Sequence, residues 1–112
     1  MLLRDKDRKS IMEIFSTVDF PIEIWAYGSR VTGDAFEGSD LGLVIRSPDL
    51  QRLPADIFLD LKEKIQKSNI PILVDLYDWA RLPESYHRNI ESNYEVLFSN
   101  IPSQVNNANG NS

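Results

Sequence analysis

Three features of this sequence carry groups suited to phosphate and metal chemistry. A Gly-Ser pair, Gly28 and Ser29, follows an apolar run over residues 22–27. Asp40 stands directly before a second apolar run, and Asp75 interrupts a third. A glycine lets the backbone approach a phosphate closely, while amides at a helix start and a serine hydroxyl donate hydrogen bonds to it. Carboxylates on neighbouring strands can hold Mg²⁺ against the same phosphates.

Each of these residues also has a purely structural interpretation. Gly28 and Ser29 could form an ordinary turn, and Asp40 could cap a turn through its side chain. Asp75 is harder to explain in that way, because a lone carboxylate inside an apolar strand must find hydrogen-bond partners or a metal ion. The three features together, in this order, favour phosphate and metal binding.

Hydrophobic spacing predicts the elements that position these residues. Short segments rich in β-branched and aromatic side chains are predicted strands, and segments with apolar side chains at helical spacing are predicted helices. The predicted strands cover residues 22–27, 41–45, 70–77 and 94–98, and the predicted helices cover residues 5–17, 29–32, 50–68 and 83–93. Gly28 and Ser29 then lie at a strand-to-helix turn, and Asp40 opens a strand after a loop over residues 33–38.

Length and composition describe one small globular domain. The 112 residues are enough for a single core. We expect residues 1–98 to fold and the polar segment 99–112 to be a disordered tail. The 17 acidic and 12 basic side chains give a net charge of -5, which argues against general binding of nucleic acid or of anionic membranes.

The same composition limits metal chemistry and location. The chain has no cysteine and one histidine, His87, which excludes thiolate and multi-histidine metal sites. We assign His87 no role and expect it at the surface. Residues 1–9 lack the apolar core of a signal peptide, and no apolar run approaches the roughly 18 residues that span a bilayer. A cytoplasmic protein without membrane contact is therefore expected.

The three features form an ordered motif. Residues 28–33 read Gly-Ser-Arg-Val-Thr-Gly, residues 39–43 read Ser-Asp-Leu-Gly-Leu, and residues 74–79 read Val-Asp-Leu-Tyr-Asp-Trp. This pattern resembles the minimal nucleotidyltransferases of the DNA polymerase β superfamily, whose signature is Gly-Ser-Arg-x-x-Gly, then Ser-Asp-x-Asp-Leu, then a third Asp on a later strand. The resemblance implies an α/β nucleotidyltransferase fold, a small mixed β-sheet with helices packed mainly on one face.

The resemblance also implies roles for the residues that match. Gly28 and Ser29 would bind the triphosphate of ATP, and Arg30 would lie beside it. Asp40 and Asp75 would be the catalytic carboxylates that ligate Mg²⁺, of which the family uses two ions. We expect Asp78, just past the last motif carboxylate, to cap the following turn instead of binding metal.

One position departs from the family pattern. Gly42 stands where the family has its second aspartate, two residues after Asp40 and so on the same face of the strand. Losing a ligand should cost much metal affinity or rate, since losing even a partner of a ligand typically costs 10- to 100-fold. A natural inactive relative, an altered sequence and a repositioned metal site are all open. Glu37, in the preceding loop, is not expected to replace the missing carboxylate.

Two functions from different classes follow from the resemblance. In the first, the chain is an antitoxin that transfers AMP from ATP to a hydroxyl, expected to be a tyrosine, of a helical HEPN-type partner protein. In the second, it has lost turnover at Gly42 and neutralises or scaffolds that partner by contact. A third, less favoured hypothesis is that the chain is a regulator that only binds a nucleotide. Self-association into a homo-oligomer is left open by the sequence.

Overall fold

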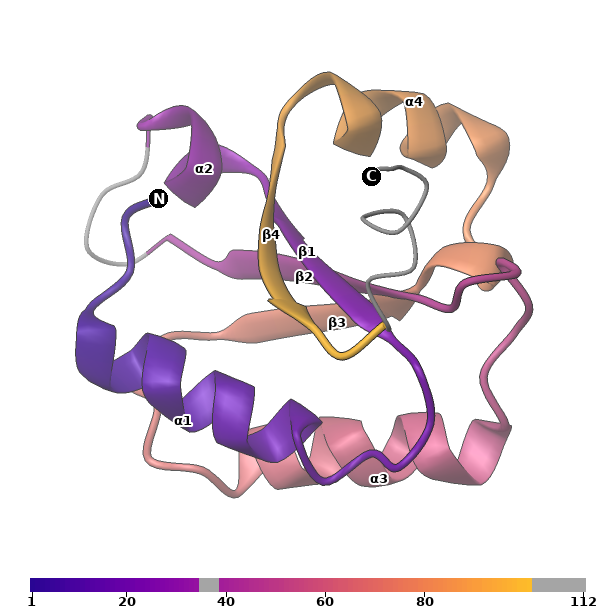
Figure 1. The fold of residues 1–112 in the computed structure, drawn as a ribbon. Coiled ribbons are helices and arrows are strands. Elements are labelled where there is room, and N and C mark those ends of the chain that lie inside the picture. The colour runs from indigo at the N-terminus through magenta and orange to yellow at the C-terminus, as the bar shows by residue number, and fades with distance from the viewer. Residues whose placement is uncertain (35–38, 102–112) are drawn as a thin grey trace, which may run out of the picture.

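The computed structural model describes residues 1–34 and 39–101, and these form a four-stranded mixed sheet (Figure 1). The strands are β1 (Glu23–Tyr27), β2 (Leu41–Arg46), β3 (Val74–Asp78) and β4 (Tyr94–Ser99), in the spatial order β3-β2-β1-β4. β1 pairs antiparallel with β2 and β4, and β2 pairs parallel with β3. The predicted mixed sheet is confirmed.

Helices cover the two faces of this sheet unequally. The two long helices, α1 (Asp5–Phe15) and α3 (Ala55–Gln66), lie side by side on one face, whereas α4 (Glu84–Ser92) lies on the other (Figure 1). The short helix α2 (Ser29–Thr32) follows β1, and the 3₁₀ helix η1 (Trp79–Arg81) follows β3. Within residues 1–34 and 39–101, no helix combines the length and the apolar character that crossing a membrane requires.

Successive side chains along each strand point to opposite faces of the sheet, and two hydrophobic clusters result. Leu41, Leu43 and Ile45 of β2 are buried in the main core, beneath α1 and α3. Gly42 and Val44 lie between them in sequence and therefore face the other side of the sheet. On that side a smaller cluster forms from Trp25, Val44, Trp79 and Ile90. The candidate site is on this second face, opposite the main core.

The structure corrects several predicted boundaries. α3 begins at Ala55 instead of residue 50, after the extended Pro54. β3 begins at Val74 because the preceding segment contains Pro71, which has no amide hydrogen for a strand ladder. β4 includes Ser99, and the Asn100 amide donates to the carbonyl of Ile22 over 3.1 Å, so the fold extends past the predicted boundary at residue 98. Residues 102–112, most of the predicted tail, lie outside the described residues.

Candidate active site

The predicted phosphate-binding turn is formed by residues 28–33, which we call the Gly28 turn. Gly28 has a φ of 94°, a conformation that glycine adopts without the steric cost other residues pay. Its carbonyl accepts the amides of Val31 and Thr32 over 3.0 and 3.1 Å, which starts α2. The first amides of such a helix have no intrahelical acceptor and can bind an anion. Gly28 itself is exposed, so the turn is accessible.

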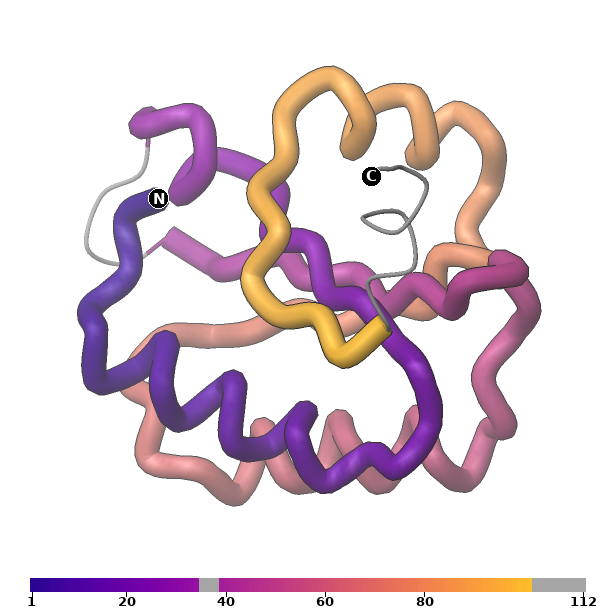
Figure 2. Tube along the Cα trace, in the orientation of Figure 1, coloured from indigo at the N-terminus to yellow at the C-terminus, as the bar shows by residue number. Residues whose placement is uncertain are grey.

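Arg30 connects this turn to the strand that carries the aspartate. Its side chain is buried, with the residue only 8% exposed. The guanidinium donates to the Ser39 carbonyl over 2.8 Å and to the Leu2 carbonyl over 2.7 Å. The Leu2 amide donates back to the Arg30 carbonyl, and Figure 2 shows the N-terminal segment running beside α2. Arg30 therefore fixes the backbone directly before Asp40, and its predicted contact with a nucleotide stays a prediction.

The strand registers align the second and third motifs. Gly42 pairs with Asp75 on β3 and with Tyr27 on β1, and Tyr27 pairs with Tyr94 on β4. These four residues, Tyr94, Tyr27, Gly42 and Asp75, form one row across the sheet, here called the Gly42 row. Asp75 therefore lies in this row and is half-buried, whereas Asp40 stands one residue before β2 and is exposed. Strand alternation continued back from Gly42 would put Asp40 on the same side of the sheet as Asp75.

The space beside Gly42 is taken by an aromatic ring. A Cβ atom built on Gly42 would lie 2.8 Å from both Cε2 and Cζ of Tyr27. Tyr27 is half-buried, and this burial, with smaller contributions from Tyr77, Asp75 and Tyr86, raises the pKa of its hydroxyl to about 12. Tyr27 is therefore a neutral phenol at physiological pH and does not supply the negative charge of a carboxylate.

The side chains in this region do not fit the pair of Mg²⁺ ions that the resemblance implies. Mg²⁺ is usually held by one or two carboxylates together with substrate phosphates. Asp40 and Asp75 could serve one such ion, but the ligand that two ions would share is missing at Gly42. Among the described residues, no group of three or more His, Cys, Asp or Glu side chains could hold a metal ion. Glu37 lies outside the described residues.

Asp78 has the structural role predicted for it. The residue is only 2% exposed, and its carboxylate accepts hydrogen bonds from the amides of Leu53 and Ala80 over 2.9 and 3.2 Å. It also forms an ion pair with Arg81. The carboxylate therefore caps η1 and joins it to the start of α3, and it is not directed to the Gly42 row.

A stack of flat side chains, unpredicted from the sequence, supports the site face. The guanidinium of Arg46 lies 3.9 Å from the ring centroid of Trp25 and 4.4 Å from that of Trp79. Tyr94 stacks on Trp25 at 3.7 Å, and His87 stacks on Trp79 at 3.9 Å. Such cation–π and stacking contacts stabilise packed surfaces. The expectation that His87 is a plain surface residue was wrong. His87 lies on α4 and is half-buried, with its ring stacked on Trp79 of η1.

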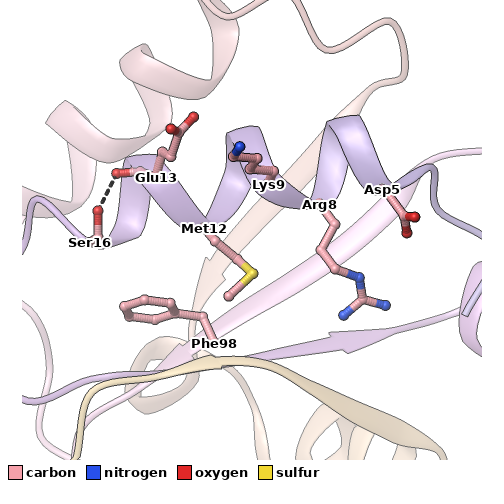
Figure 3. A pocket seen from close by; sticks show the side chains of 7 residues that line it. All are labelled: Asp5, Arg8, Lys9, Met12, Glu13, Ser16 and Phe98. Atoms are coloured by element: carbon pink, nitrogen blue, oxygen red, sulfur yellow. Dashed lines mark hydrogen bonds between the residues drawn. The ribbon is translucent and has the colours of Figure 1, made fainter.

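A separate groove lies on the other side of the molecule. It has a volume of about 430 Å³ and runs between α1 and β4, with Met12 and Phe98 facing each other across it (Figure 3). Charged side chains of α1, including Arg8 and Glu13, line its edge. Phe98 packs against the main core, so this groove opens on the face opposite the Gly42 row.

Solved structures share this fold. A crystal structure of a toxin–antitoxin with AMP-PNP superimposes with a TM-score of 0.68, at 17% identity over 87% of this chain and 75% of that one. A structure of the toxin–antitoxin MntA-HpeT, with two aspartates changed to glutamate, gives 0.67 at 16% identity and the same coverage. A putative nucleotidyltransferase from Sulfolobus solfataricus gives 0.52 at 14% identity, over 83% of this chain and 77% of that one.

Sequence comparison defines the family. The probable protein adenylyltransferase MntA of Haemophilus influenzae is 41% identical over 76 residues, which are 66% of this chain. The match spans 63% of that relative, less than two thirds of its length. The sequence model of the family described as Polymerase beta, Nucleotidyltransferase matches residues 9–102, which include both predicted motif strands and the Gly28 turn. The chain therefore belongs to the polymerase β nucleotidyltransferase family.

Proposed function

We propose that this chain is the nucleotidyltransferase-fold half of a two-component toxin–antitoxin pair, and that it restrains a HEPN-type partner by contact without transferring AMP. The Gly28 turn still binds a nucleoside triphosphate such as ATP in this proposal. Mg²⁺ would accompany the triphosphate through Asp40 and Asp75. The fold then serves as a binding module whose nucleotide site no longer supports turnover.

The observation that carries this proposal is the register of Gly42 with Asp75. Position 42 is where the family pattern requires a carboxylate, and it has no side chain. Catalysis by two metal ions depends on ligands that hold both ions between the attacking and leaving oxygens. Asp40 and Asp75 alone leave that arrangement incomplete, whereas partner binding requires no catalytic ligand.

Similarity to known proteins supports the proposed partner. The related structures include toxin–antitoxin complexes, and the relative at 41% identity is described as a probable protein adenylyltransferase. A nucleotidyltransferase core of this kind has little surface for selecting a second substrate by itself. A dedicated partner protein would supply that selectivity, and exposed aromatic residues near the site, Tyr77, Tyr86 and Tyr94, offer contact area.

The second candidate function is transfer of AMP from ATP to a tyrosine of the HEPN-type partner. It is favoured by the retained Gly28 turn and by the carboxylates of Asp75, which pairs with Gly42, and Asp40, which precedes the same strand. In this alternative, water would take the place of the missing ligand, and a single carboxylate-bound Mg²⁺ would have to support AMP transfer. The two candidates differ in one measurable product, an adenylylated partner.

An assay with radiolabelled ATP separates the two candidates. The full chain would be mixed with Mg²⁺, labelled ATP and a candidate HEPN-type partner, sought among the proteins encoded beside it in the source genome. The proposal predicts a stable complex of the two proteins and no label on the partner. Label on the partner in the presence of the unaltered chain would refute it, and failure of the two proteins to associate would refute the partner assignment. Gly42→Asp is the matched variant, expected to gain label.

A further inference from the structure

Tyr27 and Gly42 face each other on neighbouring strands of the site. We propose that the two residues fit each other. Because Gly42 has no side chain, the Tyr27 ring can lie over β2. There the ring occupies the space from which a carboxylate at position 42 would reach a metal ion. Tyr27 then becomes the residue that closes the site in this chain. This inference deepens the proposed loss of turnover and rests on it.

The geometry shows how closely the two residues fit. Three ring atoms of Tyr27, Cε2, Cζ and Cδ2, would lie 2.8, 2.8 and 3.2 Å from a Cβ on Gly42. Separations below about 3 Å are far inside the van der Waals contact of carbon atoms. Any side chain at position 42 must therefore displace this ring. An aromatic ring covering a cross-strand glycine also compensates for the glycine, which otherwise weakens a strand.

Neighbouring contacts keep the ring in place. Tyr27 packs against the cluster of Trp25, Val44, Trp79 and Ile90. On its other side it pairs with Tyr94, whose ring is stacked on Trp25 at 3.7 Å. Displacing the Tyr27 ring into solvent would give up its contacts with this cluster. Insertion of atoms into such a packed region is typically destabilising.

The consequence is that one change reopens the site only in part and two changes are needed to reopen it fully. Gly42→Asp supplies the missing carboxylate but leaves its oxygens in competition with the Tyr27 ring. Tyr27→Leu together with Gly42→Asp removes the far end of that ring while keeping an apolar side chain on β1. The double variant should therefore present the complete set of Asp40, Asp75 and the new carboxylate without the cost of moving the ring.

Proton NMR tests the closed ring directly. Aromatic rings shift the resonances of protons that lie over their faces, so the Gly42 Hα resonances should be displaced from their random-coil positions. Tyr27→Leu should return them toward those positions. Tyr77→Leu, which removes an exposed tyrosine from β3 of the same face, is the matched control and should change them far less. Unchanged Gly42 resonances in Tyr27→Leu would overturn the inference.

Binding of Mn²⁺ alone tests the consequence for metal. Four proteins would be titrated: the unaltered chain, Tyr27→Leu, Gly42→Asp and the double variant. We expect the double variant to bind Mn²⁺ about tenfold more tightly than Gly42→Asp, because about 1.4 kcal/mol spent on moving the ring equals a factor of ten. Tyr27→Leu alone should bind as weakly as the unaltered chain. Equal affinities of Gly42→Asp and the double variant would overturn the inference.

Two controls keep these results interpretable. Near-ultraviolet circular dichroism of the Trp25 and Trp79 cluster reports whether each variant is folded, and Tyr27→Phe, which keeps the ring, should behave like the unaltered chain in both measurements. Neither experiment uses ATP or the partner protein. AMP transfer by the unaltered chain would therefore refute the proposed function, while the Gly42 resonances and the Mn²⁺ affinities decide this inference separately.

Discussion

Gly28 and Gly42 both lie in family motifs, but different forces require a glycine at each. Gly28 has a positive φ of 94°, and a Cβ there would meet no atom within 4 Å. Gly42 lies within a strand without a positive φ, and a Cβ there would strike the Tyr27 ring. The first glycine is required by the backbone of its turn, the second by a neighbouring side chain. The Gly28 turn therefore has the backbone conformation predicted for phosphate binding, whereas in the Gly42 row an aromatic ring occupies the space beside the glycine.

The largest expected effect concerns Arg30, which links the two regions. Arg30→Ala would remove the donors to the Ser39 and Leu2 carbonyls and leave a cavity beneath α2. We expect a loss of about 2 to 4 kcal/mol in the free energy of unfolding, measured by urea denaturation. Arg88→Ala, on an exposed face of α4, is the matched control and should change stability by less than about 0.5 kcal/mol. Equal effects would show that Arg30 does not hold the regions together.

Gly42→Ala should cost about 1 to 3 kcal/mol, because the added methyl group overlaps the Tyr27 ring. The cost should fall to near zero or reverse in a Tyr27→Leu background, since the far end of the ring is then gone. A double-mutant cycle measured by urea denaturation gives the coupling between the two positions directly. A coupling energy within experimental error of zero would contradict the packing argument.

Gly28→Ala should cost about 1 to 2 kcal/mol through backbone strain at positive φ. Gly28→Asn should cost less, because asparagine tolerates the left-handed region better than alanine. This order of stabilities, read from thermal unfolding, distinguishes a backbone requirement from a packing requirement. At Gly42 the order should follow side-chain size instead, so asparagine there should be worse than alanine.

A further effect, confined to alkaline pH, is expected at Tyr27. Its hydroxyl has a pKa of about 12 in the folded chain, against about 10 for an unfolded tyrosine. The folded state therefore holds this proton more tightly, so the associated stability is complete below about pH 10 and is lost as the pH rises toward 12. Tyr27→Phe should lack this part of the alkaline loss. The difference in urea midpoint between the two proteins, followed from pH 9 to pH 12, measures it, and parallel curves would contradict it.

Local pattern accounts for much of the fold. Each described strand and α-helix was predicted, most of them within two residues of their bounds, because periods of two and 3.6 are properties of neighbouring residues. α3 began later than predicted, since its apolar spacing continues through a segment that Pro54 keeps extended. Asp75 lies on β3 beside Gly42 of β2, and Asp40 stands directly before β2, so the two residues lie on or next to adjacent strands.

The contacts that could not be predicted join residues that lie far apart in the sequence. The pairing of Tyr27 with Gly42 depends on the register between β1 and β2, which no local pattern specifies. The position of Arg46 between Trp25 and Trp79 requires three separate elements to meet. The burial of Arg30 follows from the N-terminal segment packing beside α2. None of these contacts has a signal in sequence spacing.

The central claim is that the Gly42 row has lost AMP transfer while the fold has kept partner binding. Its most direct test measures label from radiolabelled ATP on the HEPN-type partner, with the unaltered chain and the double variant of Tyr27→Leu and Gly42→Asp assayed side by side. The account predicts that both proteins bind the partner and that only the double variant labels it. Label transferred to the partner by the unaltered chain would contradict it.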